Sequence, residues 1–171
     1  SSCQVCHRES EETLRNNVYD RQRKVIEIRD KAEELIVRAH VEAALAWEKG
    51  ATEEEMAAVL DLIRTSQWYW DYAAAGHGNS FHSPVEISRV IGKSIDHAQE
   101  ARVALARILA GHGHFEAVPY PDIATKEKAQ EYLRLPMEKF HEEKDHFLET
   151  IVPEWRRIAD EREATYVVLS E

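Results

Sequence analysis

The sequence has few glycines and prolines, two cysteines and no long apolar run. Six glycines and five prolines among 171 residues leave little punctuation for a series of short strands. No apolar stretch approaches the roughly 20 residues that a helix needs to cross a bilayer, so we expect a protein that is not transmembrane. Two cysteines are too few for a disulfide scaffold, and their close spacing indicates a cofactor instead.

The chain also has a shortage of basic residues. Lysine and arginine number 22 against 32 aspartates and glutamates, which gives a formal net charge of -10. Phosphate binding requires a basic face, so nucleic acid is not expected as a partner. The same charge disfavours docking on an anionic membrane surface.

Helical patterns run through nearly all of the chain. The first helix is expected to begin after Ser10, an N-cap followed by Glu11 and Glu12, where the helix dipole favours acidic side chains. It continues without proline or glycine until Gly50. About 39 residues make a helix of about 58 Å. Few single domains need so long a helix, so we expect part of its apolar stripe to meet another subunit.

Four further helices are expected, the first two of them from capping signals. Thr52 and Glu55 form a capping-box pair at the start of the second, and Ser83 and Glu86 flank a first-turn proline at the start of the third. Pro153 should kink or interrupt the last helix. The expected helices span residues 52–75, 83–111, 125–133 and 136–162.

One motif carries chemistry. Cys3-Gln4-Val5-Cys6-His7 is the C-x-x-C-H attachment sequence for c-type haem. Two thiols at this spacing add to the two vinyl groups of the porphyrin, and the imidazole of the next residue becomes an axial ligand of the iron. We therefore expect Cys3 and Cys6 to bind haem c covalently and His7 to ligate its iron.

Two other uses of a C-x-x-C pair are weaker. A zinc site needs two more ligands at comparable spacing, and the sequence has no second cysteine pair. A thioredoxin-like redox pair lies beside a βαβ unit, and the sequence shows no strand pattern. The haem interpretation is favoured over both.

The iron also needs a second ligand or an open site, and nine histidines are available. His82 lies before a helix cap, on an expected loop, where it can reach outward. Mid-helix histidines are usually packing or solvated residues, and those among glycines or on a strongly charged helix are usually exposed. These remaining histidines are His40, His97, His77, His112, His114, His141 and His146. The expected second helix, about 23 residues long, returns about 20 Å short of the start of the first, so we expect His82 to ligate a neighbouring haem.

Several segments resemble a known family. They are residues 63–72 (IRTSQWYWDY), 81–84 (FHSP), 121–130 (PDIATKEKAQ) and 151–155 (IVPEW). Together with the haem motif they resemble the C-terminal half of the ammonia-forming cytochrome c nitrite reductases, and the resemblance covers essentially the whole chain. The chain begins only two residues before the haem motif, as we expect of a fragment excised from a longer protein.

The resemblance implies a periplasmic pentahaem oxidoreductase that reduces nitrite to ammonium with six electrons, takes electrons from a redox donor protein and forms a homodimer. Cys3, Cys6 and His7 would then serve the fifth haem, and His82 would be the distal ligand of the fourth. A calcium site and the catalytic residues would lie upstream, so no catalytic residue is expected in this chain.

The expected architecture is therefore all-α, with long antiparallel helices in a multihaem c-type cytochrome. Residues 1–9 form the haem-attachment segment, and residues 10–171 form a helical domain with a dimer interface. Two alternatives stay open. In the first, the chain is part of an octahaem nitrite reductase or of a hydroxylamine-oxidising relative. In the second, it belongs to a non-catalytic multihaem electron carrier.

Overall fold

The chain is built from helices. The computed structural model describes residues 2–76 and 78–166, and this part of the chain contains helices and no strand. The predicted all-α fold is therefore confirmed. In chain order the elements are η1 (Ser2–Val5), α1 (Glu11–Glu48), α2 (Glu53–Ala75), α3 (Asn79–His82), α4 (Pro84–Gly111), α5 (Lys126–Tyr132) and α6 (Met137–Glu163).

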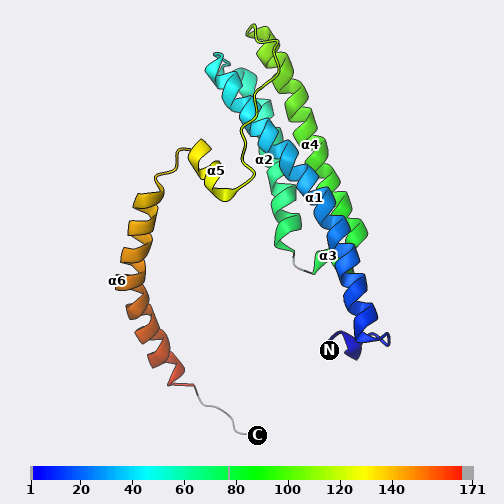
Figure 1. The fold of residues 1–171 in the computed structure, drawn as a ribbon, viewed down its shortest axis with the longest axis vertical. Helices are drawn as coiled ribbons and strands as arrows, with labels where there is room; N and C mark the ends of the chain where they lie inside the picture. Colours follow the sequence, from blue (N-terminus) through cyan, green and yellow to red (C-terminus); the bar gives the residue numbers. More distant parts are fainter. Residues whose placement is uncertain (1, 77, 167–171) are drawn as a thin grey trace. The chain divides into compact units, whose positions relative to one another are not determined.

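The chain divides into two compact units, Ser1–Tyr120 and Pro121–Glu171. In the first unit the long helices α1, α2 and α4 lie side by side (Figure 1), and α4 packs against both of the others. The predicted division into residues 1–9 and 10–171 stays a prediction.

The first two helices begin where their capping residues predict. The Ser10 side chain accepts a hydrogen bond from the Thr13 backbone N–H at 3.2 Å. Thr52 and Glu55 form the complete capping box, with the Glu55 carboxylate accepting from the Thr52 backbone N–H at 2.8 Å. Such reciprocal bonds satisfy N–H groups that have no partner inside the helix.

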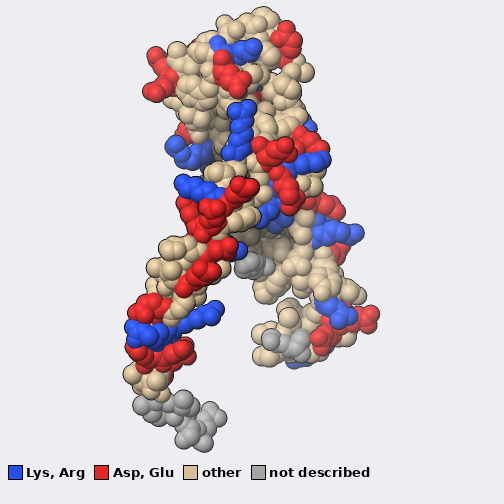
Figure 2. Space-filling model, turned by 60° about the vertical axis from the view of Figure 1, so that its left-hand side comes forward, with Lys and Arg blue, Asp and Glu red and all other residues tan. Residues whose placement is uncertain are grey.

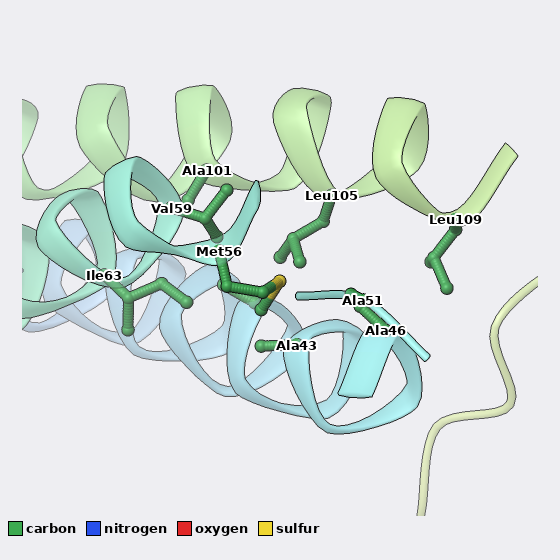
Figure 3. Packing of buried hydrophobic residues seen from close by; sticks show 10 residues of the cluster. Ala43, Ala46, Ala51, Met56, Val59, Ile63, Ala101, Leu105 and Leu109 are labelled. Carbon is green, nitrogen blue, oxygen red and sulfur yellow. The ribbon is translucent and has the colours of Figure 1, made fainter. Parts of the chain in front are cut away.

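The main hydrophobic core lies between the end of α1, the start of α2 and the end of α4. Met56 of α2 and Leu105 of α4 are both fully buried, and they point toward the α1 residues Ala43 and Ala46 (Figure 3). Alanines on α1 leave room for these larger side chains. The other buried members of this cluster are Ala39, Ala51, Val59, Ile63, Ala101 and Leu109.

Two small residues join α2 to α4 at mid-length. Ser66 and Ser94 are both fully buried. The Ser66 hydroxyl donates to the Ser94 carbonyl at 2.7 Å, and the Ser94 hydroxyl donates to the Ser66 carbonyl at 2.8 Å. These reciprocal bonds satisfy the buried hydroxyls, and the short side chains allow the two helix backbones to approach closely.

A buried carboxylate fastens the segment after α4 to the bundle. The Nε of Arg102 donates to Glu42 at 2.9 Å, and the Tyr120 hydroxyl donates to the same oxygen at 2.5 Å. Burial lowers the pKa of Arg102, but the hydrogen bond and charge of Glu42 outweigh it and raise the pKa overall. Burial and the Glu42 bond raise the pKa of Tyr120. The guanidinium of Arg38 lies 5.0 Å from the centre of the Tyr120 ring.

Two predictions about prolines and caps are corrected. Ser83 makes no side-chain cap hydrogen bond, and Glu86 pairs with Arg89 at 2.6 Å instead of closing a capping box. Pro84 does occupy the first turn of α4. Pro153 does not interrupt α6, which continues from Met137 to Glu163, and the kink at Pro153 stays a prediction. The residues around Pro153 are exposed or half-buried, so water can reach the carbonyl that loses its donor.

The second unit contains α5 and α6, and neither helix has a buried residue among those described. The start of α5 is capped by Thr125, whose hydroxyl accepts from the Lys128 backbone N–H at 3.3 Å. Large apolar side chains of α6 lie exposed, and Phe147 and Trp155 contact edge to face with ring centroids 5.4 Å apart. Among residues 121–166 the second unit therefore buries no apolar core of its own.

Candidate haem-attachment site

The C-x-x-C-H motif forms a tight turn. The Cys3 carbonyl accepts the backbone N–H of Cys6 at 3.2 Å and that of His7 at 2.9 Å. The turn keeps the two cysteines and the histidine close together, and the segment packs against α1. Both cysteines are free thiols with exposed side chains, and the His7 imidazole is about half exposed. All three side chains are accessible to a cofactor.

A cavity of about 580 Å³ lies at this turn. That volume is within the roughly 300–1,000 Å³ typical of small-molecule and cofactor sites. It is lined by Cys3, Cys6, His7, Glu9, Leu14, Asn17, Val18, Arg21, Phe81 and His82. The motif and His82, 75 positions later in the sequence, therefore face one cavity.

His82 reaches the cavity from a helix that the sequence analysis did not predict. It is the last residue of α3, a single turn, rather than part of a loop. The His82 ring lies 4.5 Å from that of Phe81, centroid to centroid. The Phe81 carbonyl accepts a hydrogen bond from Nη1 of Arg21 at 2.8 Å, which links this turn to α1.

Six of the cavity residues were not predicted as site residues from the sequence, namely Glu9, Leu14, Asn17, Val18, Arg21 and Phe81. Leu14, Val18 and Arg21 are spaced four and three apart, so they share one face of α1. Phe81 directly precedes His82. The helical spacing was readable in the sequence, but which α1 face meets α3 depends on tertiary packing.

The residues at the cavity fit a c-type haem. Two free thiols and the His7 imidazole are the groups that attach a porphyrin and ligate its iron, and a second imidazole, that of His82, faces the same cavity. The walls contributed by Leu14, Val18 and Phe81 supply apolar surface. Residues 2–76 and 78–166 contain no group of three or more His, Cys, Asp or Glu able to hold a metal ion.

The other described histidines do not line this cavity. His97 stacks on Tyr69 with ring centroids 5.8 Å apart, and His112 lies 3.2 Å from the Glu55 carboxylate. His114 lies 3.3 Å from Glu116. Three more are exposed on helices, namely His40, His141 and His146. His77 lies outside the described residues.

Comparisons with known proteins agree with this site. The family model for cytochrome c552 matches residues 1–164. The chain belongs to the cytochrome c552 family. A cytochrome c-552 of Bacteroides fragilis is 60% identical over 154 residues, and one of Porphyromonas gingivalis is 54% identical over the same length. A cytochrome c-552 of Parabacteroides distasonis is 54% identical over 160 residues.

These matches cover most of this chain but a minor part of each relative. They include 90% of the chain and 31% of the relative for Bacteroides fragilis and Porphyromonas gingivalis, and 94% and 32% for Parabacteroides distasonis. The chain thus spans about a third of the length of these relatives.

The family corrects the resemblance found in the sequence. The matching family is cytochrome c552, and the relatives are named cytochromes rather than nitrite reductases, so the predicted family and the predicted nitrite-reducing enzyme are both wrong. The physical reason is that the haem motif specifies haem attachment and the quoted segments lie mostly in helices, and neither specifies a reaction. They contain no residue expected to act on nitrite. Nitrite as substrate and calcium as cofactor were implied by the resemblance and lose their support with it.

The comparisons do support the coarser prediction of a c-type cytochrome with haem c. None of the helices in the described part of the chain is long and apolar enough to cross a membrane. Acidic and basic side chains are interspersed on the face seen in Figure 2.

Proposed function

We propose that this chain carries electrons as a haem-bearing part of a c-type cytochrome. The observation that supports this function is the shared cavity, in which both motif thiols and the imidazoles of His7 and His82 are brought together. The match to cytochrome c552 supports the same function.

Each residue has a distinct role in this proposal. Cys3 and Cys6 form thioether bonds that keep the cofactor attached, and His7 ligates its iron. When bound, haem c supplies a one-electron iron couple whose potential depends on axial ligands, hydrogen bonding and burial. The apolar side chains of Leu14 and Val18 restrict water on one side of the cavity.

We propose His82 as an axial ligand of a neighbouring haem. The helical rise supports a second haem: α3 is bonded to Arg21, which lies ten residues, or about 15 Å, from Glu11 at the start of α1. His82 thus approaches α1 well beyond the point where the motif segment joins it. Both histidines line one cavity, so the two haems of this proposal would lie close together, as rapid electron exchange requires.

The location and partners are proposals of the same kind. Covalent attachment retains haem where free haem would be lost, which supports a periplasmic location, and a redox donor protein is needed to supply electrons. A homodimer interface on the helical part, residues 10–171, finds support in the exposed apolar side chains of α6, such as Trp155.

The test is replacement of both thiols. We expect the double variant Cys3→Ser, Cys6→Ser of the full-length protein to lose one covalently bound haem per chain, because each thioether needs a thiol. Haem content is measured from the pyridine haemochrome spectrum and by haem staining after denaturing electrophoresis. Val5→Ala is the matched control, since Val5 lies inside the motif, is 86% exposed and offers no thiol. An unchanged haem content in the double variant would overturn the proposed function.

A further inference from the structure

Arg21 connects the two parts of the candidate site. It lies on α1, lines the cavity and donates from Nη1 to the Phe81 carbonyl at 2.8 Å. The acceptor belongs to the residue directly before His82. Among the described residues this is the side-chain hydrogen bond that joins α1 to α3.

The short helix α3 packs against α1 and α4 without burying a side chain. It contains four residues, its N-cap Gly78 provides no side-chain bond, and none of its residues is buried. A single helical turn is unstable alone, because nucleation fixes several residues for one hydrogen bond. The position of His82 therefore depends on contacts between α3 and its neighbours, of which the Arg21 bond is a directional one.

The charge of Arg21 is not used elsewhere in the described part of the chain. The adjacent Asp20 pairs with Arg23 at 2.9 Å and Lys24 at 2.7 Å, whereas Arg21 has no carboxylate partner among the described ion pairs. A guanidinium has five N–H donors, and the Phe81 carbonyl accepts from one of its nitrogens. The remaining donors and the positive charge are available at the cavity, where a haem brings two carboxylates.

We propose that Arg21 is a positioning residue for haem ligation. It holds the Phe81–His82 turn against the cavity and places a positive charge beside the haem that His82 ligates. This inference rests on the proposed function, in which His82 ligates iron. A nearby positive charge favours the reduced, less positive iron, so Arg21 also raises the reduction potential.

Three substitutions separate the hydrogen bond from the charge. Arg21→Ala removes both, Arg21→Gln retains an N–H donor without charge, and Arg21→Lys retains the charge. Arg15→Ala is the matched control, because Arg15 is exposed on the same helix, carries the same charge and does not line the cavity. Arg21 is itself exposed, so none of these changes removes core packing.

The first measurement is amide hydrogen exchange over residues 79–83 in the full-length, haem-loaded protein. The Ser83 N–H donates to the Asn79 carbonyl at 3.0 Å, so its exchange reports whether α3 is formed. We expect Arg21→Ala to raise exchange in this segment at least tenfold over Arg15→Ala. Arg21→Gln should raise it less.

The second measurement is the ferric electron paramagnetic resonance spectrum, with the midpoint potentials. Arg21→Ala should convert part of one low-spin signal to high spin, because His82 is no longer held at the iron, and should lower one midpoint potential. Arg21→Gln should lower that potential with most of the low-spin signal kept, whereas Arg21→Lys should leave it near that of the unmodified protein.

His82→Ala is the reference that distinguishes the two possible failures. If His82→Ala leaves every low-spin signal intact, His82 is not a ligand, and the proposed role of His82 is overturned together with this inference. If His82→Ala converts one signal to high spin but Arg21→Ala matches Arg15→Ala in exchange, spectrum and potential, only the role of Arg21 is overturned.

Discussion

The two ends of the α1–α2–α4 bundle differ in how they are held together. At the end away from the haem motif, Met56 and Leu105 are fully buried and Glu42 fastens the segment that ends at Tyr120. At the motif end, no described residue of α1 before Val25 is buried, and α3 has no buried residue at all. The comparison shows that the candidate site occupies the end with the least packing from the chain itself.

The difference has a physical consequence. A c-type haem is a large, mostly apolar group, and covalent attachment makes it a permanent part of the fold. Apolar cavity walls such as Val18 and Phe81 can then be covered by cofactor instead of by side chains. Packing at the motif end is expected to depend on haem, and packing at the opposite end on the sequence alone.

The largest expected effect comes from the core of the well-packed end. We expect Met56→Ala to lower the free energy of unfolding by about 2–5 kcal/mol, because it removes a fully buried side chain and leaves a cavity between three helices. Thermal or urea unfolding of the full-length protein measures this loss.

Tyr19→Ala provides the comparison at the motif end of α1. Tyr19 is 61% exposed, so its truncation should cost less than about 1 kcal/mol. Equal losses for the two variants would contradict the contrast between the ends.

A smaller effect is expected from the buried carboxylate. Arg102→Met should cost about 1–3 kcal/mol, because Glu42 has a side chain only 7% exposed and would lose its charged partner. Tyr120→Phe removes one donor but leaves Arg102 in place, so about 1 kcal/mol is expected.

The same unfolding experiment measures both variants, and the double variant reports their coupling. Because Arg102 and Tyr120 donate to the same oxygen of Glu42, their effects should not be additive. Additive losses would show that the two bonds act independently.

The sequence predicted local features of the fold well. Ser10 and Thr52 cap helices because a hydroxyl reaches an N–H three residues away, a distance fixed by the helix itself. Gly50 ends the first helical segment with a φ of 94°, a conformation that glycine adopts without strain. The haem motif is likewise local, since its two thiols and its imidazole lie within five residues.

Features set by tertiary structure were not predicted. Helix α3 is one turn long and gives too little periodicity to recognise, and Arg21 meets Phe81 across 60 residues. The hydroxyl of Ser83 had the right spacing for a cap but is not used as one. The resemblance to nitrite reductases failed for a related reason: helical segments and a haem motif identify a cytochrome, but not a reaction.

The smallest expected effect is a pH dependence at the well-packed end. The hydrogen bonds from the Thr52 backbone and side chain, followed by that of His112, hold the pKa of Glu55 below its usual value of about 4.3. The folded state thus favours the ionised carboxylate, so this stabilisation is present above pH 4.3 and is lost as the pH falls through the lower, folded-state pKa. The unfolding midpoint of Glu55→Gln should therefore approach that of the unmodified protein as the pH falls below about 4. Glu53→Gln, in the same first turn but outside the capping box, is the control. If the difference in unfolding midpoint between Glu55→Gln and the unmodified protein stays constant down to pH 3, the capping box does not depend on the ionised form of Glu55.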